Sequence, residues 1–238
     1  MIELFFWPTP NGMKPLIFLR EIGVEYRLTP VNINSGEQFE PQFLHISPNA
    51  RIPAILDHDP EDGGPALSIF DSGAILIYLA RKTRALLPEP AREQMNVLQW
   101  LMWQMGALGP MLGQNHHFNV YAPEKVPYAI QRYDKEASRL YAVLDRQLED
   151  REFICIDYSI ADIACYPWIN RYERHRIDLA LFPNVQRWYR AIGKRPAVIE
   201  AYAEAAQVNE GIAVDRNASA SILFGQTAET MRQAVSEN

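Results

Sequence analysis

Residues 51–74 read RIPAILDHDPEDGGPALSIFDSGA, and they predict two strands that are joined by a loop and followed by a helix. The apolar run Ile52–Asp57 is typical of a buried strand, because a cluster of Asp, Gly and Pro residues ends it. That cluster, Asp59–Pro65, predicts a turn, and Ala66–Phe70 predicts the returning strand. Asp71-Ser72-Gly73 then sets two favoured helix-capping residues ahead of a helical pattern.

The first fifty residues predict a strand, a helix and a second strand. Ile2–Phe6 is an apolar run that stops before Pro8, and Tyr26–Val31 predicts the second strand. Between them, apolar residues recur at helical spacing up to Gly23, a residue type favoured just after a helix end. A strand–helix–strand connection is a crossover, so the two strands should be parallel. Pro41–Ile46 predicts a further short helix.

This order of elements predicts an α/β N-terminal domain of thioredoxin-like type, βαβ followed by ββα. After Pro90 no stretch has the pattern of a strand, so the second domain should be all-α. Its predicted helices are Met95–Leu112, Pro127–Leu148, one that starts at Ser159, Pro183–Ile192 and Ala197–Ala206.

Prolines between residues 82 and 90 indicate a linker between the two domains. We place the first domain at 1–83, the linker at 84–90, the helical domain at 91–208 and a C-terminal tail at 209–238. The tail is thin in apolar residues, and Ile222-Leu223-Phe224 is the group suited to anchor it.

Composition and charge exclude several classes of protein. The 238 residues carry a net charge of -6 and contain no long run of Lys or Arg, so we predict no nucleic-acid partner. The chain opens with an acid at Glu3 and no basic segment, which is unlike a signal peptide. Its apolar stretches are far shorter than a membrane span. We therefore expect a cytoplasmic protein with no membrane partner.

The cysteines and histidines of the sequence indicate neither a disulfide framework nor a metal site. Cys155 and Cys165 lack the Cys-x-x-Cys spacing and lie among apolar residues, so we expect buried, inert thiols. Adjacent side chains on a helix point about 100° apart, so His116 and His117 are poorly placed to share a metal ion. We therefore predict no metal.

Two motifs at strand ends suggest a site for a peptide-like ligand. A cis bond at Ile52-Pro53 would expose the backbone N–H and C=O of Ile52 to such a ligand, although an ordinary proline at a strand start explains the same letters. Asp71-Ser72 at a helix start suits the ammonium and carboxylate of an amino-acid head group. Simple helix capping is the alternative there.

Thr9-Pro10-Asn11 follows the first strand and stands at the start of the first helix. A thiolate at this place would be stabilised by the helix dipole and by a hydroxyl or amide donor. The alternative interpretation is again a cap and a turn.

The order of these motifs resembles the cytosolic glutathione transferases over about residues 1–206. Arg51-Ile-Pro-Ala-Ile-Leu-Asp57 looks like the cis-proline segment of that family, and Asp71-Ser-Gly-Ala-Ile75 looks like its γ-glutamyl-binding segment. Tyr158-Ser-Ile-Ala-Asp-Ile163 is similar to the capping box of its helical domain. The preceding segment, Ile154-Cys-Ile-Asp157, departs from the family pattern because it lacks the usual glycine.

A closer resemblance is to the bacterial nu-class branch, the glutathione-dependent disulfide-bond oxidoreductases. The segments that carry it are Pro8-Thr-Pro-Asn-Gly12, Ser47-Pro-Asn49, Gly109-Pro-Met-Leu-Gly-Gln-Asn-His-His-Phe118 and Pro127-Tyr-Ala-Ile-Gln-Arg-Tyr133. The resemblance implies that Thr9 and Asn11 activate glutathione. It further implies contacts to glutathione from Gln38, Arg51, Ile52, Pro53, Asp71 and Ser72, and from Arg132 across a homodimer interface.

The function that this resemblance implies is reduction of small disulfides with glutathione as cosubstrate. The first 150 residues contain no cysteine, which excludes a dithiol mechanism there but permits glutathione to supply both sulfurs. The alternative enzyme is a classical transferase that conjugates glutathione to electrophiles, because the same thiolate serves both reactions. A non-catalytic glutathione-binding scaffold is a third, less favoured hypothesis.

Overall fold

A computed structural model describes residues 1–211 and 216–236 of the chain. The described residues fall into two compact units. The N-terminal unit consists of Met1–Lys82 together with the described part of Glu200–Asn238, and the helical unit consists of Thr83–Ile199.

The N-terminal unit contains a four-stranded mixed sheet in the order β2-β1-β3-β4. Its strands are β1 (Ile2–Phe6), β2 (Tyr26–Pro30), β3 (Ala54–Asp57) and β4 (Leu67–Phe70). β1 and β2 pair in parallel, as the crossover predicts, whereas β1–β3 and β3–β4 are antiparallel. The predicted order, βαβ followed by ββα, is therefore confirmed.

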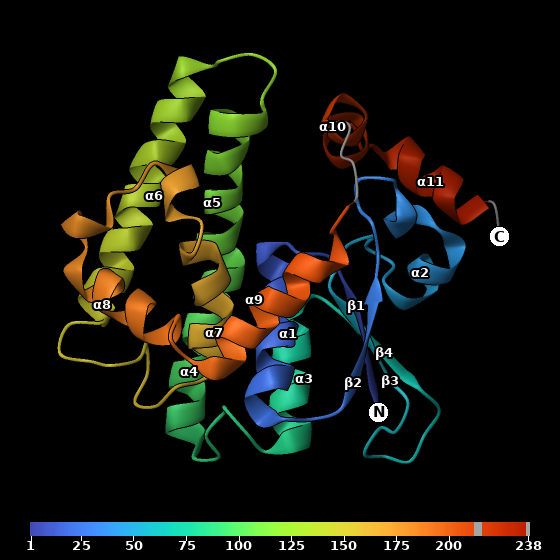
Figure 1. Ribbon diagram of the computed structural model, residues 1–238, viewed down its shortest axis with the longest axis horizontal. Helices are drawn as coiled ribbons and strands as arrows, with labels where there is room; N and C mark the ends of the chain where they lie inside the picture. Colours follow the sequence, from blue (N-terminus) through green and yellow to red (C-terminus); the bar gives the residue numbers. More distant parts are fainter. Residues whose placement is uncertain (212–215, 237–238) are drawn as a thin grey trace. The chain divides into compact units, whose positions relative to one another are not determined.

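Helices cover both faces of this sheet. α1 (Pro10–Ile22) and α3 (Ser72–Thr83) lie on one face, and α2 (Pro41–Ile46) lies on the other (Figure 1). α1 is buried on all sides over Gly12–Leu19, and Leu16, Ile17, Phe18 and Leu19 are fully buried. The helix ends as predicted: Gly23 adopts φ 67°, and its N–H donates to the Leu19 carbonyl.

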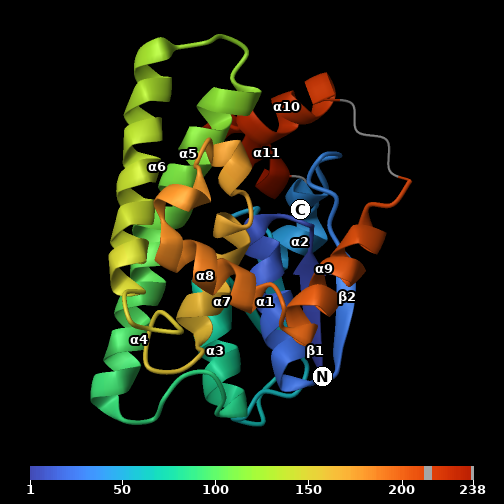
Figure 2. The ribbon, with the colours of Figure 1, turned by 60° about the vertical axis from the view of Figure 1, so that its left-hand side comes forward.

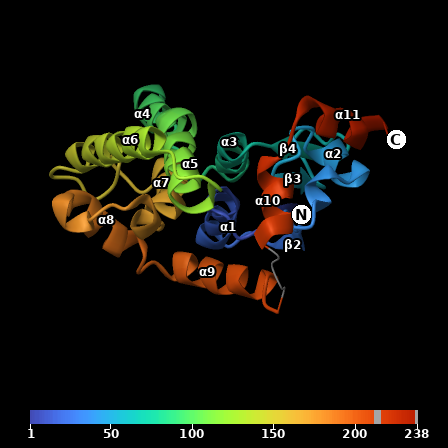
Figure 3. The same cartoon turned by 90° about the horizontal axis from the view of Figure 1, so that it is seen from above.

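The segment after Glu200 belongs to the N-terminal unit. α9 (Pro196–Val208) ends there, and Glu204 accepts hydrogen bonds from Arg20 at 2.8 Å and from the Tyr26 hydroxyl at 2.5 Å. α10 (Arg216–Phe224) and α11 (Ala228–Ser236) follow, and α11 contacts α2 (Figure 3). Ile222 of α10 lies next to Gly36. Ile222, from the apolar group expected to anchor the tail, thus packs against the N-terminal part of the chain, and most of the described tail residues form helices.

The helical unit is built around two long helical rods. α4 (Ala91–Trp103) and α5 (Gly109–His116) run on from each other through a wider π-type turn at Gln104–Leu108. A second such turn, His117–Tyr121, ends this rod, and α6 (Pro127–Gln147) packs alongside it (Figure 2). The remaining elements are α7 (Ile160–Ile169), α8 (Pro183–Ile192) and the short turns Tyr172–His175 and Leu179–Leu181.

The first rod is longer than the predicted helix, Met95–Leu112, at both ends. Gly109 and Pro110 are residue types that commonly end a helix. Here the wider π-type turn before them accommodates the proline ring and its missing N–H, so the rod continues. Glycine fits closely at position 109, because a Cβ there would lie 2.7 Å from Gln104 Nε2 and would displace that side chain.

The predicted capping box at the start of α7 is confirmed. Ser159 accepts from the N–H of Ala161, and Asp162 accepts from the N–H of Ser159 at 3.0 Å. Asp162 is fully buried and also accepts from the N–H of Ile154 at 3.0 Å and from Trp188 Nε1 at 2.9 Å. Hydrogen bonds to this carboxylate therefore connect the loop at Ile154, the start of α7 and Trp188.

Within the described part of the chain, no helix combines the length and the apolar character that a membrane crossing needs.

Candidate functional site

The register of the sheet brings most of the predicted site residues to the same end of the strands. Phe5 pairs with Ala54 and Ala54 pairs with Phe70, so the ends of β1 and β4 lie beside the start of β3. The end of β2 lies there too, because Phe6 pairs with Pro30. We call this end of the sheet, where β1, β2 and β4 end and β3 begins, the site edge. Thr9, Asn11, Gln38, Arg51, Ile52, Pro53, Asp71 and Ser72 lie in the segments that meet it.

Thr9 is the N-cap of α1. Its Oγ1 accepts from the N–H of Gly12 at 3.1 Å, so the expected alternative, a cap, is part of its role. A hydroxyl has one donor and two acceptor positions, so this cap leaves the hydroxyl proton of Thr9 as a donor. Asn11 follows at the second position of α1. The turn is tight, because a Cβ on Gly12 would lie 2.2 Å from the carbonyl oxygen of Trp7.

Asp71 lies between β4 and α3, and Ser72 is the first residue of α3. Asp71 adopts the left-handed conformation, φ 72°, and its Oδ1 accepts from the N–H groups of Gly73 and Ala74 at 3.0 and 3.2 Å. Asp71 thus caps α3 with one oxygen, while Oδ2 accepts no hydrogen bond from a described residue. Ser72 is 3% exposed.

The Ile52-Pro53 bond is cis, as predicted. β3 begins at Ala54 and not at Ile52, so the backbone of Ile52 lies outside the ladder. The preceding residue is held by the hydroxyl of Ser47, which donates to the carbonyl of Arg51 at 2.9 Å. Partial burial lowers the pKa of the Arg51 guanidinium, which forms no ion pair with a described residue.

Gln38 lies in the short turn Glu37–Phe39 and is 1% exposed. Its Nε2 donates to the carbonyl of Ile33 at 3.3 Å. Its Oε1 is buried and accepts no hydrogen bond from the residues that the structure describes. A buried acceptor without a donor is uncommon in folded proteins and suits a ligand N–H.

Lys14 is a residue of this region that the sequence pattern did not single out. It lies in α1, is fully buried, and donates from Nζ to Ser72 Oγ at 3.0 Å. The available signal was its position in the otherwise apolar run Met13–Leu19, which predicts a helix segment buried on all sides.

Arg132 lies on α6 in the helical unit, where its side chain is 56% exposed. Its guanidinium is 3.6 Å from Glu136, which also accepts a closer bond from Arg139. Arg132 belongs to the helical unit, whereas the segments of the site edge belong to the N-terminal unit.

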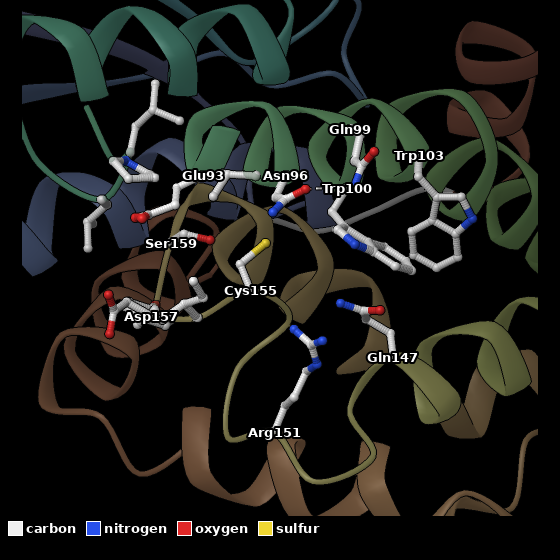
Figure 4. A pocket seen from close by; sticks show the side chains of 16 residues that line it. Glu93, Asn96, Gln99, Trp100, Trp103, Gln147, Arg151, Cys155, Asp157 and Ser159 are labelled. Carbon is white, nitrogen blue, oxygen red and sulfur yellow. Dashed lines mark hydrogen bonds between the residues drawn. The ribbon is translucent and has the colours of Figure 1, made fainter. Parts of the chain in front are cut away.

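A cavity of about 750 Å³ lies within the helical unit and contains none of the predicted site residues. α4, the end of α6 and residues 151–159 line it, and the Cys155 sulfur points toward Asn96 (Figure 4). Burial raises the pKa of Cys155 to about 12, so this thiol is protonated at neutral pH. Among the described residues, no group of three or more His, Cys, Asp or Glu side chains could hold a metal ion.

Two histidines lie near each other in the helical unit: His175 is buried and His116 is partly buried. The rings of His116 and His175 are 6.3 Å apart, and His175 Nδ1 is 3.2 Å from the Tyr141 hydroxyl. Burial lowers the pKa of His116 to about 4 and that of His175 to about 3, and the charges of Arg171 and Arg174 act in the same direction. Both histidines are therefore neutral in the folded protein at pH 6.

We expect the free energy of unfolding to fall by about 1 kcal/mol when the pH is lowered from 7 to 6. In the unfolded chain both histidines take up protons near their ordinary pKa of about 6.5, and this stabilises the unfolded state. Burial raises the pKa of Asp162 to about 6. Protonation of Asp162 in the folded protein therefore increases the free energy of unfolding as the pH falls, mostly below pH 6. Urea unfolding at both pH values measures the change. His175→Phe should show a smaller change, and a stability that rises between pH 7 and 6 would contradict this account.

Comparison with known proteins identifies the family. The model of the glutathione S-transferase N-terminal domain matches residues 1–81, and that of the C-terminal domain matches residues 110–196. The disulfide-bond oxidoreductase YfcG of Escherichia coli is 55% identical over 206 residues, which is 86% of this chain and 96% of YfcG. The disulfide-bond oxidoreductase YghU of the same organism is 39% identical, over 83% of this chain and 72% of its own length.

A solved structure agrees with these matches. The glutathione transferase from Pseudomonas putida, determined with one glutathione disulfide bound per subunit, has a TM-score of 0.81 and 40% identity. The match covers 84% of this chain and 90% of that one. The predicted fold class is confirmed, and the chain belongs to the glutathione S-transferase family, near its disulfide-bond oxidoreductases.

Proposed function

We propose that this chain is an enzyme that uses glutathione to reduce small disulfides, and that it binds glutathione at the site edge. The observation that carries the proposal is the sheet register, which gathers Thr9 and Asn11, Ile52, and Asp71 and Ser72 at one edge of one unit. The names of YfcG and YghU, and the glutathione disulfide in the Pseudomonas putida transferase, support the same chemistry.

The reaction proceeds by two thiol–disulfide exchanges. The thiolate of glutathione attacks one sulfur of the substrate disulfide, which forms a mixed disulfide and releases the other substrate sulfur as a thiolate. A second glutathione thiolate then attacks the glutathione sulfur of the mixed disulfide. This step releases the second substrate thiolate and leaves glutathione disulfide. The two released thiolates take up the two protons that the glutathione thiols lost.

Thr9 and Asn11 are the residues that we assign to the glutathione sulfur. The hydroxyl proton of Thr9 and the side-chain amide of Asn11 are donors at the positive end of the α1 dipole. Neither side chain is a base at neutral pH. They therefore act by stabilising the thiolate, which raises its population at neutral pH.

Asp71 and Ser72 are the residues that we assign to the γ-glutamyl head group. The Oδ2 of Asp71 suits the ammonium, and the hydroxyl of Ser72 with the start of α3 suits the carboxylate. The backbone of Ile52, set by the Arg51 and Pro53 that flank it, pairs with the cysteinyl part of the peptide. Gln38 Oε1 accepts a peptide N–H.

Asp71→Asn should weaken glutathione binding by about tenfold or more, because it removes the charge that holds the ammonium. Asparagine still caps α3 and tolerates the left-handed conformation at this position. The loss should therefore appear as a higher dissociation constant without a loss of stability, and kcat at saturating glutathione should change little. Calorimetric titration that gives an unchanged affinity would place the head group elsewhere.

We further propose that the protein is a homodimer and that Arg132 of each subunit contacts the glutathione bound by its partner. Each unit exposes apolar side chains that fit an interface. Phe70 on the edge strand β4 is 41% exposed, and Met102 on α4 is 50% exposed. A two-fold interface would bury Phe70 and Met102 of both subunits.

Light scattering at micromolar concentration should give twice the mass of the chain. Met102→Glu should shift the protein toward monomer, because it buries a charge in the interface, whereas Leu181→Glu, at a side chain that is 74% exposed, should not. A monomer for the unaltered protein at this concentration would contradict the proposed assembly.

Paired assays of the purified protein test the proposed function against its alternatives. Glutathione-dependent reduction of a small disulfide should exceed conjugation to a chloronitrobenzene. Predominant conjugation would favour the classical transferase, and no turnover in either assay would favour a scaffold. Cys155→Ala and Cys165→Ala should keep full activity, since both residues are buried and neither forms a disulfide. Cysteines outside disulfides suit the cytoplasmic location that we also propose.

A further inference from the structure

The cavity of about 750 Å³ in the helical unit is a feature that the proposed chemistry does not use. Every residue that lines it belongs to Thr83–Ile199, so one compact unit provides all of its walls. Sites that enclose a whole small molecule have volumes of about 300–1,000 Å³, and this cavity falls within that range. Its lining combines apolar surface with a few polar and charged side chains, which is the usual composition of such sites (Figure 4).

Two tryptophans of α4 form one wall of the cavity. Trp100 and Trp103 are three positions apart, so they lie on the same side of the helix. Their rings meet edge to face with centroids 5.1 Å apart, and this contact holds both indoles in place. Each tryptophan is only partly buried, although this residue type is highly buried on average. The pair therefore presents a fixed aromatic surface on which another aromatic ring can stack.

Arg151 provides the positive charge of the cavity. It follows the end of α6, where its N–H donates to the Leu148 carbonyl at 3.2 Å. Its guanidinium forms no ion pair with a residue that the structure describes, and it points toward Gln147 (Figure 4). Burial and the charge of Asp162 raise the pKa of the Cys155 thiol, whereas the charge of Arg151 lowers it, so Arg151 acts on the cavity wall. A guanidinium in this position suits a carboxylate or a sulfonate.

Gln147 and two acidic residues define where in the cavity an anion fits. Gln147 Nε2 donates to the Ile154 carbonyl at 2.6 Å, which fixes the amide and leaves its second N–H as a donor on the side of Arg151 (Figure 4). The carboxylates of Glu93 and Asp157 lie at the other end of the cavity (Figure 4). They repel a second acidic group there. The lining therefore admits one acidic group, at the end that Arg151 occupies.

We infer that this cavity is a second binding site, which takes a planar aromatic compound with a single acidic group. The aromatic ring of the ligand stacks on the indoles of Trp100 and Trp103. Its carboxylate or sulfonate accepts hydrogen bonds from Arg151 and Gln147. All four residues belong to the helical unit, whereas the glutathione site that we propose belongs to the N-terminal unit. Binding in the cavity therefore does not depend on the proposed function.

The test compares two fluorescent probes on the full chain at saturating glutathione disulfide. Anilinonaphthalene sulfonate is an aromatic anion, and phenylnaphthylamine has the same rings without the sulfonate. Arg151→Met should weaken binding of the sulfonate by about tenfold and leave binding of the neutral probe within about twofold. Arg146→Met is the matched control, because Arg146 is also exposed but does not line the cavity, and it should change neither affinity.

The aromatic wall is tested with the same two probes. Trp100→Leu should weaken both by about fivefold or more, because both ligands lose the ring on which they stack, whereas Trp100→Phe should keep most of the affinity. Quenching of tryptophan fluorescence by the bound sulfonate should become smaller in Trp100→Leu. If Trp100→Leu does not fold, Trp103→Leu is measured with the same probes and the same criteria.

Three results would overturn this inference. The first is an unchanged affinity for the sulfonate in Arg151→Met, and the second is an equal loss for both probes in that variant. The third is tighter binding of a cationic aromatic dye than of the sulfonate, because Glu93 and Asp157 would then determine the charge of the ligand. None of these results bears on glutathione binding at the site edge, so the proposed function would stand or fall by its own assays.

Discussion

Thr9→Val is expected to lower kcat/KM for glutathione-dependent disulfide reduction by on the order of 30- to 150-fold. Valine keeps the shape of threonine but removes a donor to the thiolate, and the loss of such a donor costs about 2–3 kcal/mol in a poorly solvated site. The fall should be larger at low pH than at high pH, because at high pH glutathione ionises without help.

Two further variants separate the donor role of Thr9 from its role as a helix cap. Thr9→Ser keeps both the cap to Gly12 and the hydroxyl proton, so activity should stay within about threefold. Thr9→Asp keeps the cap, but its carboxylate donates no hydrogen bond and repels a thiolate. We expect Thr9→Asp to be as stable as the unaltered protein and at least as inactive as Thr9→Val. An active Thr9→Asp variant would show that capping alone explains this residue.

Asp162→Ala is expected to lower the free energy of unfolding by about 4 kcal/mol. The substitution leaves three buried donors without an acceptor: the N–H groups of Ile154 and Ser159, and Trp188 Nε1. It also removes half of the capping box of α7. Urea unfolding followed by tryptophan fluorescence and by circular dichroism measures the change.

Asp157→Ala is the matched control for Asp162→Ala. Asp157 lies five positions earlier in the same segment, but its side chain is exposed. Its removal should change the stability by less than about 0.5 kcal/mol. Equal effects of the two substitutions would show that the buried hydrogen bonds of Asp162 do not hold the helical unit together.

The sequence predicted elements best where proline or glycine marks their ends. Pro41–Ile46 and Pro183–Ile192 have the predicted bounds, because proline at the first helical position leaves no doubt about the start. The predicted helix Met95–Leu112 correctly ran through Gly109 and Pro110, although both residue types commonly end a helix, because a π-type turn lets the helical rod continue there. The helices after position 215 were not predicted as elements, because they carry too few apolar residues at helical spacing.

The candidate site shows a similar division. Ile52-Pro53 and Asp71-Ser72 could be found from sequence because short motifs with known local geometry carry them, and the cis bond and the cap at Asp71 were confirmed. The assembly of these motifs at the site edge depends on strand register, which no local pattern specifies. The buried hydrogen bond from Lys14 to Ser72 could not be predicted from the sequence, because the two residues are 58 positions apart.

The thiol pKa of bound glutathione tests the central claim most directly. Thiolate absorbance of the complex is titrated in the unaltered protein, Thr9→Val and Asn11→Ala, at glutathione concentrations that saturate each variant. The account predicts a pKa below that of free glutathione for the unaltered protein and a shift back toward the free value in both variants. The same thiol pKa in all three proteins, with activity lost in the variants, would contradict the claim that Thr9 and Asn11 stabilise the thiolate.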